Sequence, residues 1–220
     1  MTGVDDSVYS VVRGRILSGM YPPGHHLLES VLTTELGVSR SPVRAALRKL
    51  STESLVVTEP HRGAFVAAMT RADIDEVFDL RQILEAKAAG LAACTRSDDE
   101  ADELFESVRV MEGIIAGRSS TYRSELLANN QQFHHLILSA ARAPRLFQIV
   151  QTLTASSLTL GTYFHYSDED IARSLEFHRD LAVAILRQHP QVAASLMAAH
   201  LGIAHHAFVD RRFGDGRAGS

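Results

Sequence analysis

The chain is poor in the features that mark secreted and membrane proteins. Its 220 residues include a single cysteine, Cys94, so no internal disulfide can form, and we expect Cys94 to be a small buried residue. Tryptophan is absent, and no uninterrupted apolar run reaches the roughly 20 residues that span a bilayer. The opening residues MTGVDDSVYS are acidic and polar, so we expect no signal peptide. These absences predict a cytoplasmic protein that does not associate with a membrane.

Positive charge is scarce over the whole chain but not in its first third. The formal net charge is −4. Between Ser7 and Met69, however, seven arginine or lysine residues outnumber four glutamates, which gives a balance of +3. A basic head on an acidic body is typical of a DNA-binding module joined to a separate regulatory domain. Histidine is the other compositional peculiarity, because eight of the eleven histidines follow residue 130.

The first third of the chain has the element order of a winged helix-turn-helix. Apolar residues at helical spacing, with Ser7 and Ser39 as N-caps, predict three helices. Two β-rich runs follow and are separated by a turn that contains Gly63. These five elements span about 7–18, 29–35, 40–52, 55–58 and 64–67. We therefore expect residues 7–69 to form a DNA-binding domain.

Everything after the second β-rich run has the pattern of helices. Breaks at positions such as Pro144 and Pro190 divide the region into six segments. The expected helices span about 71–95, 98–117, 120–141, 144–162, 168–188 and 190–212. The fold class is therefore mainly α, with an all-α second domain over residues 70–212. The Gly-rich residues 213–220 are expected to be a disordered tail.

The third predicted helix carries three arginines at four-residue spacing, which places them on one face. The N-terminal turns of such a helix enter the major groove, where an arginine can donate to both acceptors of a guanine. Serine hydroxyls nearby suit phosphates, and the tip of the wing can reach the minor groove or flanking phosphates. The predicted DNA-binding residues are Ser39, Arg40, Ser41, Arg44, Arg48, His61, Arg62 and Gly63. A solvated basic helix face is the alternative for the arginines alone, but the neighbouring elements favour DNA.

A family resemblance supports this interpretation. The stretch from PPGHHLLES through LGVSRSPVR to the wing residues RGAFV resembles the DNA-binding head of GntR-family bacterial regulators. The resemblance covers about 45 residues of the head. It implies a homodimer that binds a palindromic operator in double-stranded DNA and responds to a ligand. Most members of the family repress transcription.

The second domain resembles the FCD domain of the FadR-type subfamily, on the run Asp79-Leu80-Arg81 followed by Glu85. The resemblance implies an antiparallel helical bundle around a small pocket. It also implies that the pocket binds a small carboxylate metabolite, with Arg81 as an effector-binding residue. An ion pair between Arg81 and Glu85, one helical turn apart, is the alternative for this arginine.

Three histidines and an asparagine occupy the positions at which that family binds a divalent metal. Asn130 and His134 lie one turn apart, while His178 and His200 interrupt the apolar stripes of two later helices. The family pattern has an aspartate where this chain has Asn130. Imidazole nitrogens and an amide oxygen suit Zn²⁺ or Ni²⁺. The resemblance therefore implies a metal site, whereas the roles of His205 and His206 stay open.

Two other functions compete with a regulator. Three histidines around an open metal position could activate water in a hydrolase, although no carboxylate in the sequence is clearly placed as a general base. A helical scaffold that only dimerises is the second alternative, and it would have a fully packed interior. The winged head favours a regulator that is not an enzyme.

Overall fold

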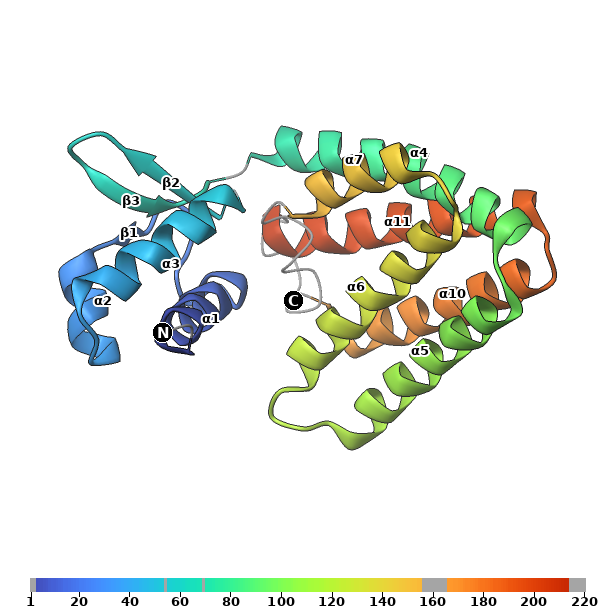
Figure 1. Ribbon diagram of the computed structural model, residues 1–220, viewed down its shortest axis with the longest axis horizontal. Helices are drawn as coiled ribbons and strands as arrows, with labels where there is room; N and C mark the ends of the chain where they lie inside the picture. The colour runs from blue at the N-terminus through green and yellow to red at the C-terminus, as the bar shows by residue number, and fades with distance from the viewer. Residues whose placement is uncertain (1–2, 54, 69, 156–165, 214–220) are drawn as a thin grey trace, which may run out of the picture. The chain divides into compact units, whose positions relative to one another are not determined.

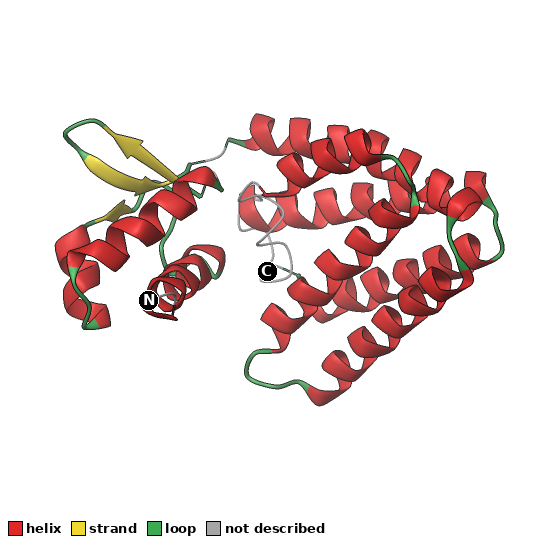
Figure 2. Ribbon diagram, in the orientation of Figure 1, coloured by secondary structure: helices red, strands yellow, loops and turns green. Residues whose placement is uncertain are grey.

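The computed structural model divides into two compact units, drawn with their elements in Figure 1. The first unit comprises residues up to Thr70, and the second comprises Arg71–Leu153 with the described residues from Tyr166 onward. Helices predominate, with a single small sheet in the first unit among the described residues (Figure 2). The predicted fold class, mainly α, is therefore confirmed. The structure describes residues 3–53, 55–68, 70–155 and 166–213.

The first unit is a three-helix head with a β-hairpin. Helix α3 has the predicted bounds, and its apolar stripe, which includes Val43 and Leu50, is fully buried. Helix α1 begins earlier than predicted, so Ser7 lies inside the helix and the prediction that it is the N-cap was wrong. The elements in chain order are α1 (Gly3–Leu17), β1 (His26–Leu27), α2 (Glu29–Leu36), α3 (Arg40–Thr52), β2 (Val56–Glu59) and β3 (Gly63–Val66).

The sheet of the head has the strand order β1-β3-β2, and both strand pairs are antiparallel. Strand β1 was not predicted, because a two-residue strand is too short to show alternation. It pairs His26 with Phe65, and the two rings stack with their centroids 4.4 Å apart. Ser54, between α3 and β2, lies outside the described residues.

The second unit contains only helices among the described residues. Ser97 and Ser167 each close a capping box, in which the serine side chain accepts from a backbone N–H three residues later. The helix predicted over 144–162 is described only as far as Ala155, and residues 156–165 and 214–220 lie outside the described residues. The helices are α4 (Arg71–Thr95), α5 (Asp98–Gly117), α6 (Tyr122–Ala140), α7 (Pro144–Ala155), α10 (Asp168–Leu186) and α11 (Pro190–Phe213).

One expectation about an apolar stretch was wrong. Cys94, expected to be buried, is exposed near the end of α4, so its apolar sequence neighbours do not reflect its own environment. One helical stretch, Pro190–Arg211, is long and apolar enough to span a membrane, with a mean hydropathy of 1.4. This is weak evidence for a membrane span, because core helices of water-soluble proteins pass the same test. In the second unit this helix packs extensively against α4.

Candidate DNA-binding surface and histidine cluster

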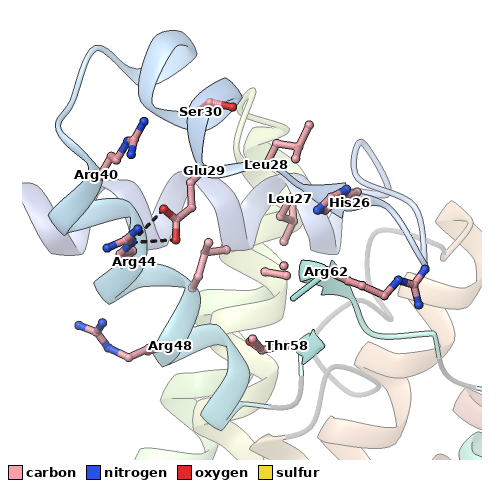
Figure 3. A pocket seen from close by; sticks show the side chains of 13 residues that line it. His26, Leu27, Leu28, Glu29, Ser30, Arg40, Arg44, Arg48, Thr58 and Arg62 are labelled. Atoms are coloured by element: carbon pink, nitrogen blue, oxygen red, sulfur yellow. Dashed lines mark hydrogen bonds and ion pairs between the residues drawn. The ribbon is translucent and has the colours of Figure 1, made fainter. Parts of the chain in front are cut away.

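The predicted DNA-binding residues lie on the exposed surface of the head. All eight are exposed, and five of them line one groove between α2, α3 and the wing (Figure 3). The groove residues among the eight are Arg40, Arg44, Arg48, Arg62 and Gly63. Ser39 is the N-cap of α3, but its side chain makes no capping hydrogen bond, which leaves the hydroxyl for another acceptor or donor. Neither Ser39, Ser41 nor His61 lines the groove.

Every glutamate counted in the head forms an ion pair with an arginine. These pairs are Glu29–Arg44, Glu35–Arg15, Glu53–Arg13 and Glu59–Arg62. Arg40 and Arg48, by contrast, make no ion pair with any residue that the structure describes. These two arginines therefore carry positive charge in the head that no described carboxylate pairs with, while the ammonium of Lys49 lies 3.9 Å from the centroid of the Tyr9 ring. Because Arg40 and Arg48 line the groove, it attracts a polyanion.

The tip of the wing is shaped by a glycine that no other residue can replace without strain. Gly63 has φ +100°, a conformation that residues with a side chain rarely adopt. A Cβ at this position would lie 2.8 Å from Nε2 of His26, which stacks on Phe65. The guanidinium of Arg62 lies 5.4 Å from the centroid of that Phe65 ring. Gly63 thus keeps β1 and the wing close enough for these rings and the arginine to pack.

Three of the four predicted metal ligands lie together in the second unit. His134 on α6, His178 on α10 and His200 on α11 are all buried, and each offers a ring nitrogen within 4.8 Å of the others. The ring centroids are 5.0 to 5.8 Å apart. Phe133 stacks on His178 at 4.1 Å and fixes the plane of that ring. The histidines come from three helices, of which α10 and α11 follow one another in the chain and α6 lies well before them.

Burial lowers the pKa values of His178 and His200 and keeps both rings neutral. Desolvation, with a smaller contribution from its histidine neighbours, holds the pKa of His178 well below 6.5. Burial, with a smaller contribution from the neighbouring His134, lowers the pKa of His200 to about 3. Both ring nitrogens of His178 are buried and have no hydrogen-bond partner among the described residues. A neutral imidazole whose nitrogens lack a partner is the form that binds a divalent cation, so the residues present fit a metal.

Glu85 on α4 joins this cluster, although the sequence indicated it only as a partner of Arg81. Its Oε2 lies 2.6 Å from Nδ1 of His134, and its Oε1 accepts a hydrogen bond of 2.7 Å from Nε of Arg81. Burial alone would raise the pKa of Glu85, but the charge of Arg81 and the contact with His134 lower it to about 2. With Nδ1 of His134 held by a carboxylate, Nε2 is the nitrogen left for a metal. The four-residue spacing of Arg81 and Glu85 was the feature of the sequence that could have pointed to Glu85 as a buried partner.

Other polar residues near the cluster have different partners. Asn130 lies one turn before His134 on α6 and is half-buried, so its role as a fourth ligand stays a prediction. Its neighbour Asn129 is buried and donates to the carbonyl of Ser107 at 3.0 Å. His205 is 2.7 Å from Asp75 and stacks on Phe78, and His206 is exposed. Neither His205 nor His206 belongs to the cluster of His134, His178 and His200.

Comparisons with known proteins agree with both units. Residues 5–66 match the family of bacterial regulatory proteins called gntR, and residues 76–202 match the FCD domain. A transcriptional regulator of Bacillus subtilis, the uncharacterized YdhC, is 26% identical over 87% of this chain and 85% of its own. The transcriptional repressor RspR of Escherichia coli is 24% identical over 90% of this chain and 86% of its own.

Solved structures share the fold as well. A putative GntR transcriptional regulator from Rhodococcus has a TM-score of 0.70 and 22% identity, and the match covers 94% of this chain and 98% of that one. At this identity the likeness shows the fold alone. With the two family matches, the arginine-lined winged head and the helical second unit, the chain belongs to the gntR family of bacterial transcription regulators and carries an FCD domain.

Proposed function

We propose that the protein is a ligand-responsive repressor that acts as a homodimer on a palindromic operator in the bacterial cytoplasm. The observation that carries the proposal is the groove of the head, where two arginines without an ion pair lie beside two that glutamates hold. Two heads related by a twofold axis would bind two half-sites about one helical turn of DNA apart. The relative RspR is named as a transcriptional repressor.

The DNA-binding role is tested with Arg44→Ala. Arg44 lines the groove and its side chain is 56% exposed, so the substitution should leave the fold intact. Loss of one base contact is expected to weaken operator binding by about tenfold or more in a gel-shift titration. Lys49→Ala is the matched control, because it also removes one positive charge from α3 but lies outside the groove residues. Equal affinities for Arg44→Ala and the unaltered protein would contradict the assignment.

We infer further that His134, His178 and His200 hold a divalent metal such as Zn²⁺ or Ni²⁺, with Asn130 as the proposed fourth ligand. The support is the convergence of three buried imidazoles and the lack of a partner among the described residues for both nitrogens of His178. A bound divalent ion supplies a positive charge and an exchangeable position for an anionic ligand. The chain itself contributes Glu85, which orients His134, and Arg81, which neutralises Glu85.

The effector is proposed to be a small carboxylate. A cavity beside His200 has room for about one water molecule, and its lining includes Arg173 and the acidic Asp170. A carboxylate would have to enlarge this cavity, and the guanidinium of Arg173 is the donor there that suits it. Arg81 is the other proposed effector-binding residue. Its Nε donates to Glu85, and its terminal amino groups are the donors proposed to bind the effector. A ligand that binds here alters DNA affinity only if it prefers one of two states of the protein.

Metal binding is tested by elemental analysis of the purified protein. We expect near-stoichiometric metal in the unaltered protein and none in His134→Ala/His178→Ala. His206→Ala is the control, since His206 is an exposed histidine outside the cluster. Equal metal content in the double variant and the control would refute the site.

A hydrolase is disfavoured because the carboxylate beside the histidines, Glu85, already binds Arg81 and His134 and is not placed as a base for water.

A further inference from the structure

An acidic side chain lies in the basic groove of the head, where it opposes binding to DNA. Glu29 is the first residue of α2, and its two carboxylate oxygens each accept from Nε of Arg44 at 2.9 Å (Figure 3). The two residues are 15 positions apart, so the fold of the head brings them together. Among the thirteen residues that line the groove, Glu29 is the single acidic one. A carboxylate facing a phosphate backbone reduces affinity for DNA of any sequence.

Stability does not account for the pair. The side chain of Arg44 is 56% exposed and that of Glu29 is 36% exposed. Ion pairs as exposed as this one contribute little to folding, because water and salt screen them. The pair therefore opposes DNA binding without a matching gain in the stability of the head.

The geometry of the pair suits base recognition. Glu29 binds only Nε of Arg44, and the two terminal amino groups of that guanidinium make no hydrogen bond with the residues that the structure describes. Those two groups are the donors that a bidentate contact to guanine requires. An arginine that is already held loses less side-chain freedom when it binds, whereas an unheld arginine can turn to the nearest phosphate.

Resting on the proposed DNA-binding function, we propose that Glu29 is a positioning residue that sets the sequence specificity of Arg44. It fixes the direction of the guanidinium and weakens binding to phosphates, so that only DNA with a guanine at the matching position recovers the loss. Arg40 and Arg48 lack such a partner among the described residues, and they serve general attraction to the duplex.

The proposal is tested by selection from a random pool of duplex DNA with the full-length protein. Glu29→Gln keeps the size of the side chain but removes its charge. Binding to unselected duplex should rise about two- to threefold because one repulsive charge is lost. The ratio of selected to unselected affinity should fall about tenfold, with the loss of preference confined to one base position in each half-site.

Two further variants separate positioning from charge. Glu29→Asp keeps the charge but withdraws the carboxylate from Nε, so base preference should fall without any gain in binding to unselected duplex. Glu59→Gln removes the same charge from the wing, where Glu59 pairs with Arg62, and should leave base preference unchanged. In an Arg44→Ala background, Glu29→Gln should no longer alter the preference.

The results that would overturn the positioning role of Glu29 differ from those that would overturn the proposed DNA-binding function. If the unaltered protein selects no sequence, the proposed DNA-binding function fails. If it selects a motif and Glu29→Gln and Glu29→Asp select the same motif with an unchanged affinity ratio, the positioning role of Glu29 is overturned. Thermal unfolding of each variant identifies a loss of folding, and either substitution alone suffices for the comparison if the other fails to fold.

Discussion

Replacing Glu85 by glutamine should destabilise the helical unit strongly, because the structure gives the carboxylate two buried partners. Glu85 is 1% exposed and Arg81 is 5% exposed, and Glu85 also accepts from His134 if that ring is the donor. Removing one member of a buried ion pair leaves the other charge uncompensated and costs about 3–5 kcal/mol. The lowering of the pKa of Glu85 from 4.5 to about 2 gives an independent figure of about 3 kcal/mol by proton linkage.

The assay is denaturant unfolding of chelator-treated protein at neutral pH, followed by far-UV circular dichroism. Glu106→Gln on α5 is the matched control, since its pair with Arg109 is more than half exposed and should contribute less than about 1 kcal/mol. Because the native pKa of Glu85 is lowered, its contribution is present above pH 4.5 and is lost as the pH falls toward 2. An unfolding free energy for Glu85→Gln within about 1 kcal/mol of the unaltered protein would refute the reasoning.

Three further predictions test other parts of the structure. Gly63→Ala should destabilise the head by about 1–3 kcal/mol in thermal unfolding, because φ is strained and the new Cβ meets His26; His26→Ala should recover only part of the loss. In chelator-treated protein the unfolding free energy should fall as the pH is lowered from 6.5 toward 3, because the unfolded chain protonates His178 and His200 while the native one does not; a flat profile would contradict this. Ser167→Ala should cost about 1 kcal/mol in urea unfolding by removing the α10 cap, and an unchanged midpoint would show that the capping box contributes nothing.

Sequence patterns predicted elements best where a chemical signal defines their ends. The bounds of α3, α4 and α5 agree with expectation. A serine precedes α3 and α5, α5 ends at Gly117, and Arg96 and Ser97 separate α4 from α5. The strand His26–Leu27 was missed because its formation depends on Phe65, far along the chain. The exposure of Cys94 was also missed, since local apolar composition does not fix which face of a helix turns outward.

The residue types of the candidate sites were predictable from the sequence, but their tertiary contacts were not. Family spacing indicated the three histidines, and helical spacing placed the three arginines of α3 on one face. The partners that orient them were not predicted, because each pairing depends on tertiary structure. Glu29 reaches Arg44 across two helices, and Glu85 reaches His134 across 49 positions of sequence. Short-range spacing contains no information on such contacts.

Helix α4 has a mechanical consequence that follows from chain continuity alone. It starts at Arg71, the first residue after the head, and it is 25 residues long. Glu85 lies on this same helix, about 21 Å from its start at the usual rise of an α-helix. Because a helix is stiff along its axis, a metal or effector that binds at His134 and tilts α4 near Glu85 would also move Arg71, where the head is attached. The attachment point of the head and the residue that holds His134 thus lie on the same stiff helix.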